Sequence, residues 1–485
     1  MKMNSRSGWR GFAGFTLSLV ALLLLQSSSM FAQTSEPAKQ TTEVDQLKQR
    51  LQQLEQTVME LKSQITAIEE TKKKTPPPAI VEATYSESPA PAETAAVPTA
   101  KPQQNANGES SFTIYGFAML DAGYQFKQAD PNWFDTVRPV KLPAFKDQFA
   151  PNGNAYFSVR QTRFGAKSST PTKYGELTTK FEFELFGTGV DAGQTTFRLR
   201  HAYGELGPIG GGQTWSAFMD IGVFPNTIEY WGPTGMVFFR NVQMRWMPVR
   251  KKSGSVTIAL ERPGASGDQG VYADRIELSN IQPRFNFPDL SGNARIDRNW
   301  GYLQTAAIVR KIGWVDTSAN TTNLGGSVVG WGINLSSNLN LSKKDVAKLS
   351  FVYGRGIENY MNDAPFDVGV ANNPPNSKVP IKGVALPVYG VVAFLDHTWS
   401  EHFTSSAGYS LIDIVNSNAQ LASDFHQGDY VVANLLYHPI PKVMMGGEFQ
   451  WGRRVNYLDG FSFNDYRMQF SFKYDWDKSF KSPSF

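Results

Sequence analysis

From residue 112 onward, apolar and polar residues alternate with a period of two over short stretches of the chain. In an extended chain, residues 176–186 would place Leu177, Thr179, Phe181, Phe183 and Leu185 on one face and Thr178, Lys180, Glu182 and Glu184 on the other. Residues 443–451 and 467–474 show the same division. The pattern predicts β-strands with one apolar and one polar face. It occurs in soluble sandwiches as well as in membrane barrels, so it does not distinguish between them.

The connections between these stretches alternate in length. With strands of about ten residues, short turns fall near 168–175, 207–210, 248–254, 299–300, 340–346, 400–402 and 438–442. Mostly longer loops fall near 125–154, 187–194, 218–237, 263–289, 313–325, 357–386, 413–427 and 454–464. Short turns on one side and long loops on the other are typical of a bacterial outer-membrane barrel. The sequence therefore predicts an all-β fold, a 16-stranded antiparallel transmembrane β-barrel over residues 112–474, followed by a C-terminal extension over 475–485.

Residues 33–70 have a different period. Apolar residues recur there in alternating steps of three and four, which is the heptad pattern of an α-helical coiled coil. The seam consists of Val44, Leu47, Leu51, Leu54, Val58, Leu61, Ile65 and Ile68. The alternative is one amphipathic helix packed on its own chain, but no neighbouring segment offers it a partner face. The seam predicts parallel association without fixing the number of chains, since its first heptads suit dimers and its last favours trimers.

Two further segments precede the barrel. Residues 1–32 carry Lys2, Arg6 and Arg10, an apolar run and a small-residue stretch ending at Ala32, which predicts a secretory signal peptide. A transmembrane anchor is the alternative, but the run is shorter than the about 20 apolar residues that span a bilayer. Residues 71–111 hold seven prolines and predict a semi-extended linker. We therefore expect export to the bacterial outer membrane, with the coiled coil in the periplasm.

Composition narrows the classes of function. The chain has no cysteine, so it offers no disulfide and no thiolate metal site, and its net charge of +4 is too small for a typical nucleic-acid binder. The five histidines show no metal-ligand spacing. Asp396 and His397 are adjacent, but neighbouring strand residues point to opposite faces and would not form a catalytic pair. The sequence thus predicts no enzyme, no metal, no cofactor and no nucleic-acid partner.

If the apolar faces contact lipid, the polar faces line a lumen. Alternation places Arg198 and Arg200 inward, beside Lys180, Glu182 and Glu184 on the neighbouring strand. One interpretation is that the two arginines only neutralise the two glutamates. The other interpretation adds more inward basic residues, which together would form a basic wall that attracts small anions. These additional residues are Arg160, Arg245, Arg295 and Arg467.

The third long loop, near 218–237, is too apolar to lie in water. We expect it to fold into the barrel and narrow the pore, with Asp220 and Glu229 opposite the lumen arginines. A field across this constriction would orient dipolar solutes and favour compact anions. Use of the loop as a contact between subunits is the competing explanation.

Several longer motifs carry a family resemblance. They are FRLRHAYGEL (197–206), GQTWS (212–216), YGRGI (353–357), YHP (437–439) and RMQFSFKY (467–474). Together with the preceding coiled coil, they resemble the DcaP-like family of trimeric outer-membrane porins. The resemblance implies a trimer and the uptake of small, often dicarboxylic, anions, although it does not fix the solute. One departure is that residues 475–485 follow the aromatic strand end at Tyr474.

We therefore predict a porin for passive diffusion of small hydrophilic solutes, with a preference for anions. The expected partners are other copies of the chain, outer-membrane lipid and small anionic solutes. Two alternatives stay open. The coiled coil and linker could tether the outer membrane to another envelope component, or the long loops could act as a surface receptor or adhesin.

Overall fold

The computed structural model describes residues 109–318, 322–374 and 379–483. The expected signal peptide (1–32), the coiled coil with its seam residues (33–70) and the linker up to residue 108 lie outside the described residues, and they stay predictions. Within the described part of the chain, no helix is long and apolar enough to cross a membrane.

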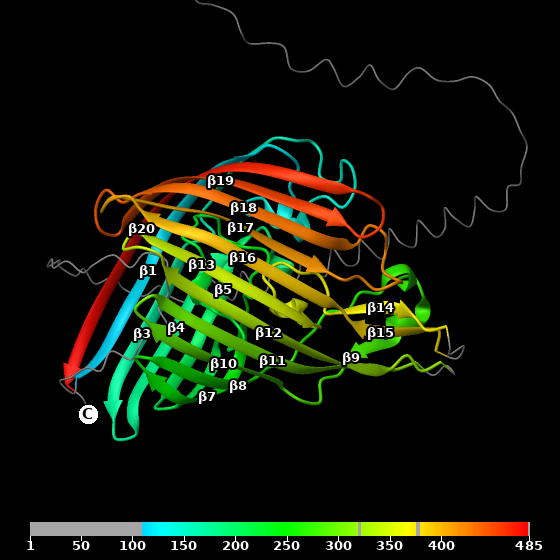
Figure 1. The fold of residues 1–485 in the computed structure, drawn as a ribbon, viewed down its shortest axis with the longest axis horizontal. Helices are drawn as coiled ribbons and strands as arrows, with labels where there is room; N and C mark the ends of the chain where they lie inside the picture. Colours follow the sequence, from blue (N-terminus) through cyan, green and yellow to red (C-terminus); the bar gives the residue numbers. More distant parts are fainter. Residues whose placement is uncertain (1–108, 319–321, 375–378, 484–485) are drawn as a thin grey trace, which may run out of the picture. The chain divides into compact units, whose positions relative to one another are not determined.

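Sixteen antiparallel strands close into a barrel, because the first strand pairs with the last along its whole length. The sixteen strands are β1 (Glu109–Gln125), β3 (Arg163–Thr172), β4 (Gly175–Phe186), β5 (Thr195–Leu206), β6 (Ile209–Trp215), β7 (Arg240–Lys251), β8 (Gly254–Glu261), β10 (Asp289–Arg298), β11 (Gly301–Asp316), β12 (Gly326–Asn340), β13 (Asp345–Arg355), β16 (Pro387–Thr398), β17 (Phe403–Ile414), β18 (Phe425–Tyr437), β19 (Val443–Asn456) and β20 (Ser462–Pro483). In Figure 1 these strands slant across the wall, and β1 lies beside β20. The predicted 16-stranded barrel is confirmed.

Short elements complete the wall and the loops. β2 (Asn154–Ser158) pairs with β1 beyond the end of β3, and β9 (Ile281–Pro283) pairs with β11 beyond the end of β10. β14 (Val368–Asn372) and β15 (Ile381–Ala385) form a separate hairpin. The 3-10 helices are η1 (Pro131–Trp133), η2 (Pro139–Lys141), η3 (Gly189–Asp191), η4 (Ile221–Val223), η5 (Gly270–Tyr272), η6 (Ile276–Asn280) and η7 (Glu358–Tyr360).

Turns and loops lie at opposite ends of the barrel, as the sequence predicted. Connections of two to five residues join the strands at the turn end, at 173–174, 207–208, 252–253, 299–300, 341–344, 399–402 and 438–442. At the loop end lie L1 (126–153), L2 (187–194), L3 (216–239), L4 (262–288), L5 (described at 317–318 and 322–325), L6 (described at 356–374 and 379–386), L7 (415–424) and L8 (457–461). Figure 1 shows the β14–β15 hairpin of L6 far from the β3–β4 turn. The pattern of short turns and long loops therefore located the strand ends to within a few residues.

The barrel extends further toward its C-terminus than we expected. β20 does not end at Tyr474 but continues to Pro483, so residues 475–483 belong to the wall and not to a separate extension. The physical reason is that β1 begins at Glu109, before the expected start, and supplies backbone partners from the pair Phe117 and Asp475 down to the pair Glu109 and Pro483. An unpaired strand end would leave its backbone N–H and C=O groups open to other chains.

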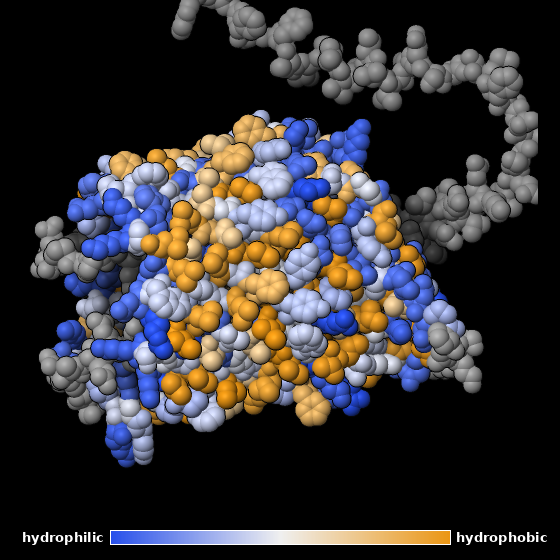
Figure 2. All heavy atoms as spheres, viewed as in Figure 1, coloured by the Kyte–Doolittle hydropathy of each residue, from blue (hydrophilic) through white to orange (hydrophobic). Residues whose placement is uncertain are grey.

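The outer surface is apolar and the inner surface is polar. On β4, Leu177 and Phe181 are exposed, whereas Glu182 and Glu184 between the outward positions are buried. Figure 2 shows hydrophobic side chains spread over the wall and hydrophilic ones gathered toward its two ends. A soluble sandwich would place its apolar faces inside, so this inversion fits a barrel that is surrounded by lipid.

Part of the barrel interior is nevertheless a hydrophobic core. It forms where L3 and L6 pack against inward-facing apolar side chains of β11, β13 and β16–β18. Its fully buried members include Phe218, Met236, Ile357, Val388 and Val432. The core fills one sector of the lumen and leaves the sector around β3–β7 to polar side chains.

Candidate functional site: the lumen beside loop L3

L3 crosses the inside of the barrel and is fastened to the inner wall. The Asp220 carboxylate accepts hydrogen bonds from the Tyr302 hydroxyl on β11 (2.8 Å) and from the Ser336 hydroxyl on β12 (2.7 Å). Lys348 on β13 donates to the backbone carbonyl oxygen of Phe224 (2.7 Å). The apolar side chains of L3, such as Phe218, are buried within this same chain. Their burial therefore needs no contact with a second subunit.

The tip of L3 is held by the opposite part of the wall. The Glu448 carboxylate on β19 accepts hydrogen bonds from the backbone N–H groups of Ile228 (2.8 Å) and Glu229 (3.0 Å). Gln469 on β20 donates to the carbonyl oxygen of Ile228 (3.2 Å). Two consecutive backbone donors thus share one carboxylate, which fixes the path of the loop.

The two acidic residues of L3 are held mainly by donors other than the lumen arginines that we expected them to face, although Glu229 interacts with the charge of the buried Arg467. Glu229 is buried and accepts from the backbone N–H groups of Val137 (3.1 Å) and Gly232 (2.6 Å) and from the Tyr430 hydroxyl (3.0 Å). Asp220 is bound to the wall as described above. Among the described residues, neither carboxylate forms an ion pair with an arginine. Both carboxylates hold the loop in place instead, because a buried carboxylate needs hydrogen-bond donors wherever it lies.

L1 and L6 support L3 from the loop end. Arg138 of L1 forms an ion pair with Asp363 of L6 (2.9 Å), and the Asp363 carboxylate also accepts from the backbone N–H of Val140 (2.9 Å). The Arg138 guanidinium lies about 4 Å from the ring centres of Trp133 in L1 and Trp231 in L3. Three loops therefore meet around one buried, stacked arginine.

The polar sector of the lumen is organised around two glutamates on β4. Glu182 accepts from Arg200 on β5 (2.6 Å) and from the Tyr115 hydroxyl on β1 (2.7 Å). Glu184 accepts from Arg200 (2.5 Å), while Arg198 lies 3.8 Å away. Arg200 is thus locked to both glutamates, as the first interpretation held, whereas Arg198 stays 27 % exposed. The first interpretation, neutralisation of the glutamates, holds for Arg200. The second, an accessible basic wall, holds for Arg198.

A β-bulge explains how β5 presents its side chains. The pairing of β4 with β5 shifts between Glu182 and Phe183, so that Glu182 lies opposite His201 and Phe183 lies opposite Leu199. Arg200 is the extra residue, and it points inward together with its neighbour His201. His201 shares a hydrogen bond with the Thr214 hydroxyl on β6 (3.0 Å). Strict alternation would have turned His201 toward lipid.

Sequence reasoning missed two cations of this cluster. Arg163 on β3 lies 3.4 Å from Glu184, and Arg240 on β7 lies 3.5 Å from the same carboxylate. Arg163 follows the break between β2 and β3, and Arg240 follows L3, so the period-two pattern could not be followed to either residue. The five cations within ion-pair distance of Glu182 and Glu184 are Arg163, Lys180, Arg198, Arg200 and Arg240. Five cations against two carboxylates leave a formal excess of three positive charges.

Arg160 and Arg467 point inward as expected, but they do not line an open pore. Arg160 is 1 % exposed and donates to Asp135 of L1 and to the Gly187 carbonyl oxygen (2.8 Å). Arg467 is fully buried and donates to the Tyr156 hydroxyl (2.8 Å) and to the Asp135 carbonyl oxygen (2.6 Å). Both arginines fasten L1 to the wall, so their expected place on the lumen surface is wrong.

The other predicted basic residues lie on the inner wall and are partly accessible. Lys180 is 30 % exposed and lies 3.3 Å from Glu182. Arg245 on β7 donates to the Gln243 side chain (2.8 Å). Arg295 on β10 pairs with Asp297 (3.0 Å) and stacks on the Tyr302 ring at 3.4 Å. These residues continue the polar sector from the cluster toward the turn end.

Exposure shows where space for solvent remains inside the barrel. Inward-facing Gln304, Asn334 and Gln450, on the side covered by L3, are at most 5 % exposed. Arg163 and Arg198, on the side of β3–β5, are 21 % and 27 % exposed. The basic wall along β3–β5 is therefore accessible to water.

A closed barrel of sixteen strands with an apolar exterior, a polar interior and an inward third loop is the architecture of an outer-membrane channel. A comparison with protein families places the chain more narrowly. Residues 92–469 match the family model described as DcaP outer membrane protein, so the chain belongs to the DcaP family. The resemblance found in the sequence motifs is confirmed. No curated protein sequence matches the chain.

Solved structures agree with this fold. The outer membrane channel DcaP of Acinetobacter baumannii superposes with a TM-score of 0.63 at 18 % sequence identity, covering 76 % of this chain and 97 % of that one. An anion-selective porin from Comamonas acidovorans has a TM-score of 0.50 at 10 % identity, covering 76 % of this chain and 100 % of that one. At these identities the structures show a common barrel and do not transfer the solutes of either protein.

Proposed function

We propose that this outer-membrane channel passes small hydrophilic solutes by passive diffusion and prefers compact anions, dicarboxylates among them. The observation that carries the proposal is the excess of three positive charges around Glu182 and Glu184, on the wall that stays open to water. Because Arg163, Lys180 and Arg198 are partly exposed, an anion can reach their charges without displacing a protein carboxylate.

The size of the effect follows from Coulomb's law. A monoanion about 8 Å from one uncompensated charge gains on the order of 2 kcal/mol at an effective dielectric constant of about 20. A cation at the same place is repelled by a similar amount. A dicarboxylate has two charges that can contact two cations of the wall in turn. Salt reduces the effect, since the Debye length falls from about 8 Å at 0.15 M to about 3 Å at 1 M.

The proposal can be tested by comparing solutes of equal length and opposite charge. Liposomes containing the purified protein would be given a labelled four-carbon dicarboxylate or a labelled four-carbon diamine. We expect the dicarboxylate to enter at least about tenfold faster at low salt, and the difference to shrink in 1 M salt. Equal entry of the two solutes, or faster entry of the diamine, would show that the basic wall does not favour anions over cations.

We also propose that three chains assemble, with residues 33–70 forming a parallel coiled coil in the periplasm after removal of the signal peptide. The heptad seam and the family resemblance support this proposal. Its test is the mass of the assembly in detergent, for the full chain and for a variant lacking residues 33–108, which leaves β1 complete. We expect a trimer for the full chain and a weaker trimer that still conducts for the deletion. A full chain that is monomeric would contradict the proposal.

The same deletion separates the channel from the envelope tether that the sequence left open. A tether would lose its role with residues 33–108, and its conductance would be incidental. A strain that carries the deletion should therefore keep solute uptake and an intact envelope if the channel is the function. A detached outer membrane with unchanged uptake would favour the tether.

A further inference from the structure

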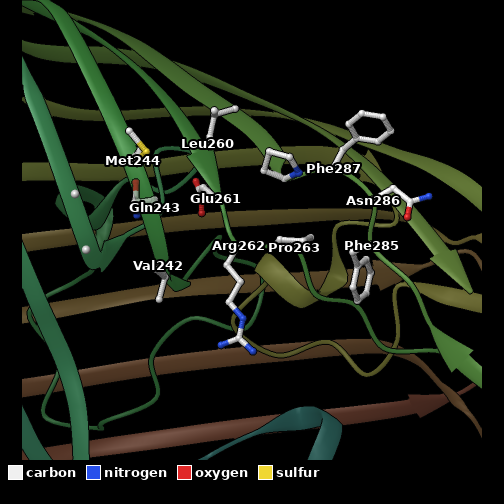
Figure 3. A pocket seen from close by; sticks show the side chains of 13 residues that line it. Val242, Gln243, Met244, Leu260, Glu261, Arg262, Pro263, Phe285, Asn286 and Phe287 are labelled. Carbon is white, nitrogen blue, oxygen red and sulfur yellow. The ribbon is translucent and has the colours of Figure 1, made fainter.

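A groove lies on the outer surface of the barrel, at the loop end of β7 and β8. It has a volume of about 590 Å³ and is bounded by these two strands and by residues 285–288 of L4. Figure 3 shows Val242 and Met244 on one side, Leu260 in the middle, and Phe285 and Phe287 on the other side. None of the ion pairs that form the lumen cluster involves these residues, so the groove is separate from the pore.

The walls of the groove are apolar and face the bilayer. Met244 is 66 % exposed, Leu260 49 % and Phe287 59 %. Their strand neighbours Gln243 and Glu261 are buried and point into the barrel. Apolar side chains of this kind on the outer wall are in contact with acyl chains, and an indentation between them gives one chain a place to lie.

Cations border the groove at the loop end. Arg262 follows β8 directly, and Figure 3 shows its side chain extending between Val242 and Phe285. Lys311 on β11 is exposed, and its ammonium nitrogen lies 5.6 Å from the ring centre of Phe287. Arg284 is also exposed, and its backbone N–H donates to the Gly313 carbonyl oxygen, two residues beyond Lys311.

These cations differ from the arginines inside the barrel. Arg295 and Arg310 pair with aspartates at 3.0 and 2.8 Å. Among the described residues, by contrast, no carboxylate lies within ion-pair distance of Arg262, Arg284 or Lys311. Their charges are therefore available to an anionic group from outside the chain.

We propose that this groove binds a phosphorylated lipid of the outer leaflet, with an acyl chain between β7, β8 and residues 285–288 and a phosphate between Arg262 and Lys311. A free anion would use the cations but leave the apolar walls without a partner. A neutral lipid would use the walls but leave the cations unpaired. A lipid with a phosphate head group matches both parts, with its head at the membrane boundary and its chain in the leaflet.

The test measures lipid binding to the purified full-length protein in detergent. The probes are bisphosphorylated lipid A, the same lipid without its phosphates, and inorganic phosphate. Native mass spectrometry counts bound lipid for the unaltered protein, for the double variant R262A/K311A, and for R355A as a matched control. Arg355 is an exposed cation at the loop end of β13, outside the groove. R262K/K311R keeps both charges and serves as the second control.

We expect the phosphorylated lipid to bind the double variant about 20- to 30-fold more weakly, from about fivefold for each cation. R355A should change binding by less than about twofold, and R262K/K311R should retain it. The conductance of all variants should match that of the unaltered protein, because no lumen contact is lost. Equal binding of the phosphorylated and dephosphorylated lipids, or equal binding by the double variant, would overturn the proposal. So would efficient competition by inorganic phosphate, or a second copy of the chain that covers the groove in the purified protein.

Discussion

The carboxylate of Glu448 on β19 accepts a hydrogen bond of 2.8 Å from the backbone N–H of Ile228 at the tip of L3. The barrel wall thus positions the loop that packs into one sector of its own lumen. The loop does not carry the charges of the pore. Arg163, Lys180 and Arg198 on β3–β5, where the cations of the wall are concentrated, stay partly exposed.

Removal of this anchor should loosen L3 without unfolding the barrel. Glu448→Ala leaves the backbone N–H groups of Ile228 and Glu229 without acceptors inside the barrel, which costs about 1–3 kcal/mol per buried group. We expect hydrogen exchange of residues 226–232 to rise about 10- to 100-fold, and the single-channel current to become noisier. Glu448→Gln keeps one acceptor and should give a smaller effect. Unchanged exchange in Glu448→Ala would mean that the loop is held by other contacts.

The two arginines of β5 should behave differently when each is replaced by alanine. Arg198 is partly exposed and 3.8 Å from Glu184, so Arg198→Ala should weaken anion preference with less than about 1 kcal/mol lost in stability. Arg200 is buried against Glu182 and Glu184. Arg200→Ala should lower the free energy of unfolding by about 3 kcal/mol, because two buried carboxylates lose their main partner.

Reversal potential and urea unfolding, measured on both variants, separate these effects. If Arg198→Ala destabilised the barrel as much as Arg200→Ala does, the distinction between an accessible and a locked arginine would fail. If Arg198→Ala left ion selectivity unchanged, Arg198 would have no part in the pore.

The outer loops should loosen as pH rises through neutrality. Burial raises the pKa of Asp424 in L7 to about 7, and its carboxyl group shares a hydrogen bond with Asp268 of L4. Asp268 also accepts from Gln420 of L7 (2.7 Å). Because the folded pKa lies above the unfolded value of 3.8, the contact is fully stabilised below about pH 4 and loses that stabilisation as pH rises through 7.

Hydrogen exchange of residues 415–424, corrected for the intrinsic effect of pH, tests this prediction. Protection should be higher at pH 5 than at pH 8 in the unaltered protein. Asp424→Asn stays neutral at both values and should remove the difference. Protection that increases toward pH 8 would show that the sign is wrong.

The strands of the barrel wall could be predicted from local sequence patterns, whereas the contacts inside the barrel could not. Alternation and turn spacing are properties of neighbouring residues, and they located the strands and the inward position of Glu182 and Glu184. The contacts of L3 join distant residues. Asp220 and Ser336 are 116 residues apart, and Glu229 and Tyr430 are 201 residues apart. No local pattern indicates such partners.

Irregular backbone explains the other features that could not be predicted from the sequence. The bulge at Arg200 turns His201 inward, and the break before β3 removes Arg160 from any alternating position. The length of β20 depends on where its partner β1 begins. The sequence of β20 alone therefore does not predict where β20 ends. Arg240 belongs to the cluster because L3 ends directly before it. Arg240 could have been predicted from its position directly after a long, buried loop.

The most direct test of the central claim is the reversal potential of the unaltered protein in a planar bilayer with a tenfold gradient of potassium chloride, whose ions have nearly equal mobilities. The excess of positive charge on the open wall predicts a potential of anion-selective sign, which decreases in Arg198→Ala and with increasing salt. A potential of cation-selective sign, or one near zero at low salt, would contradict the account.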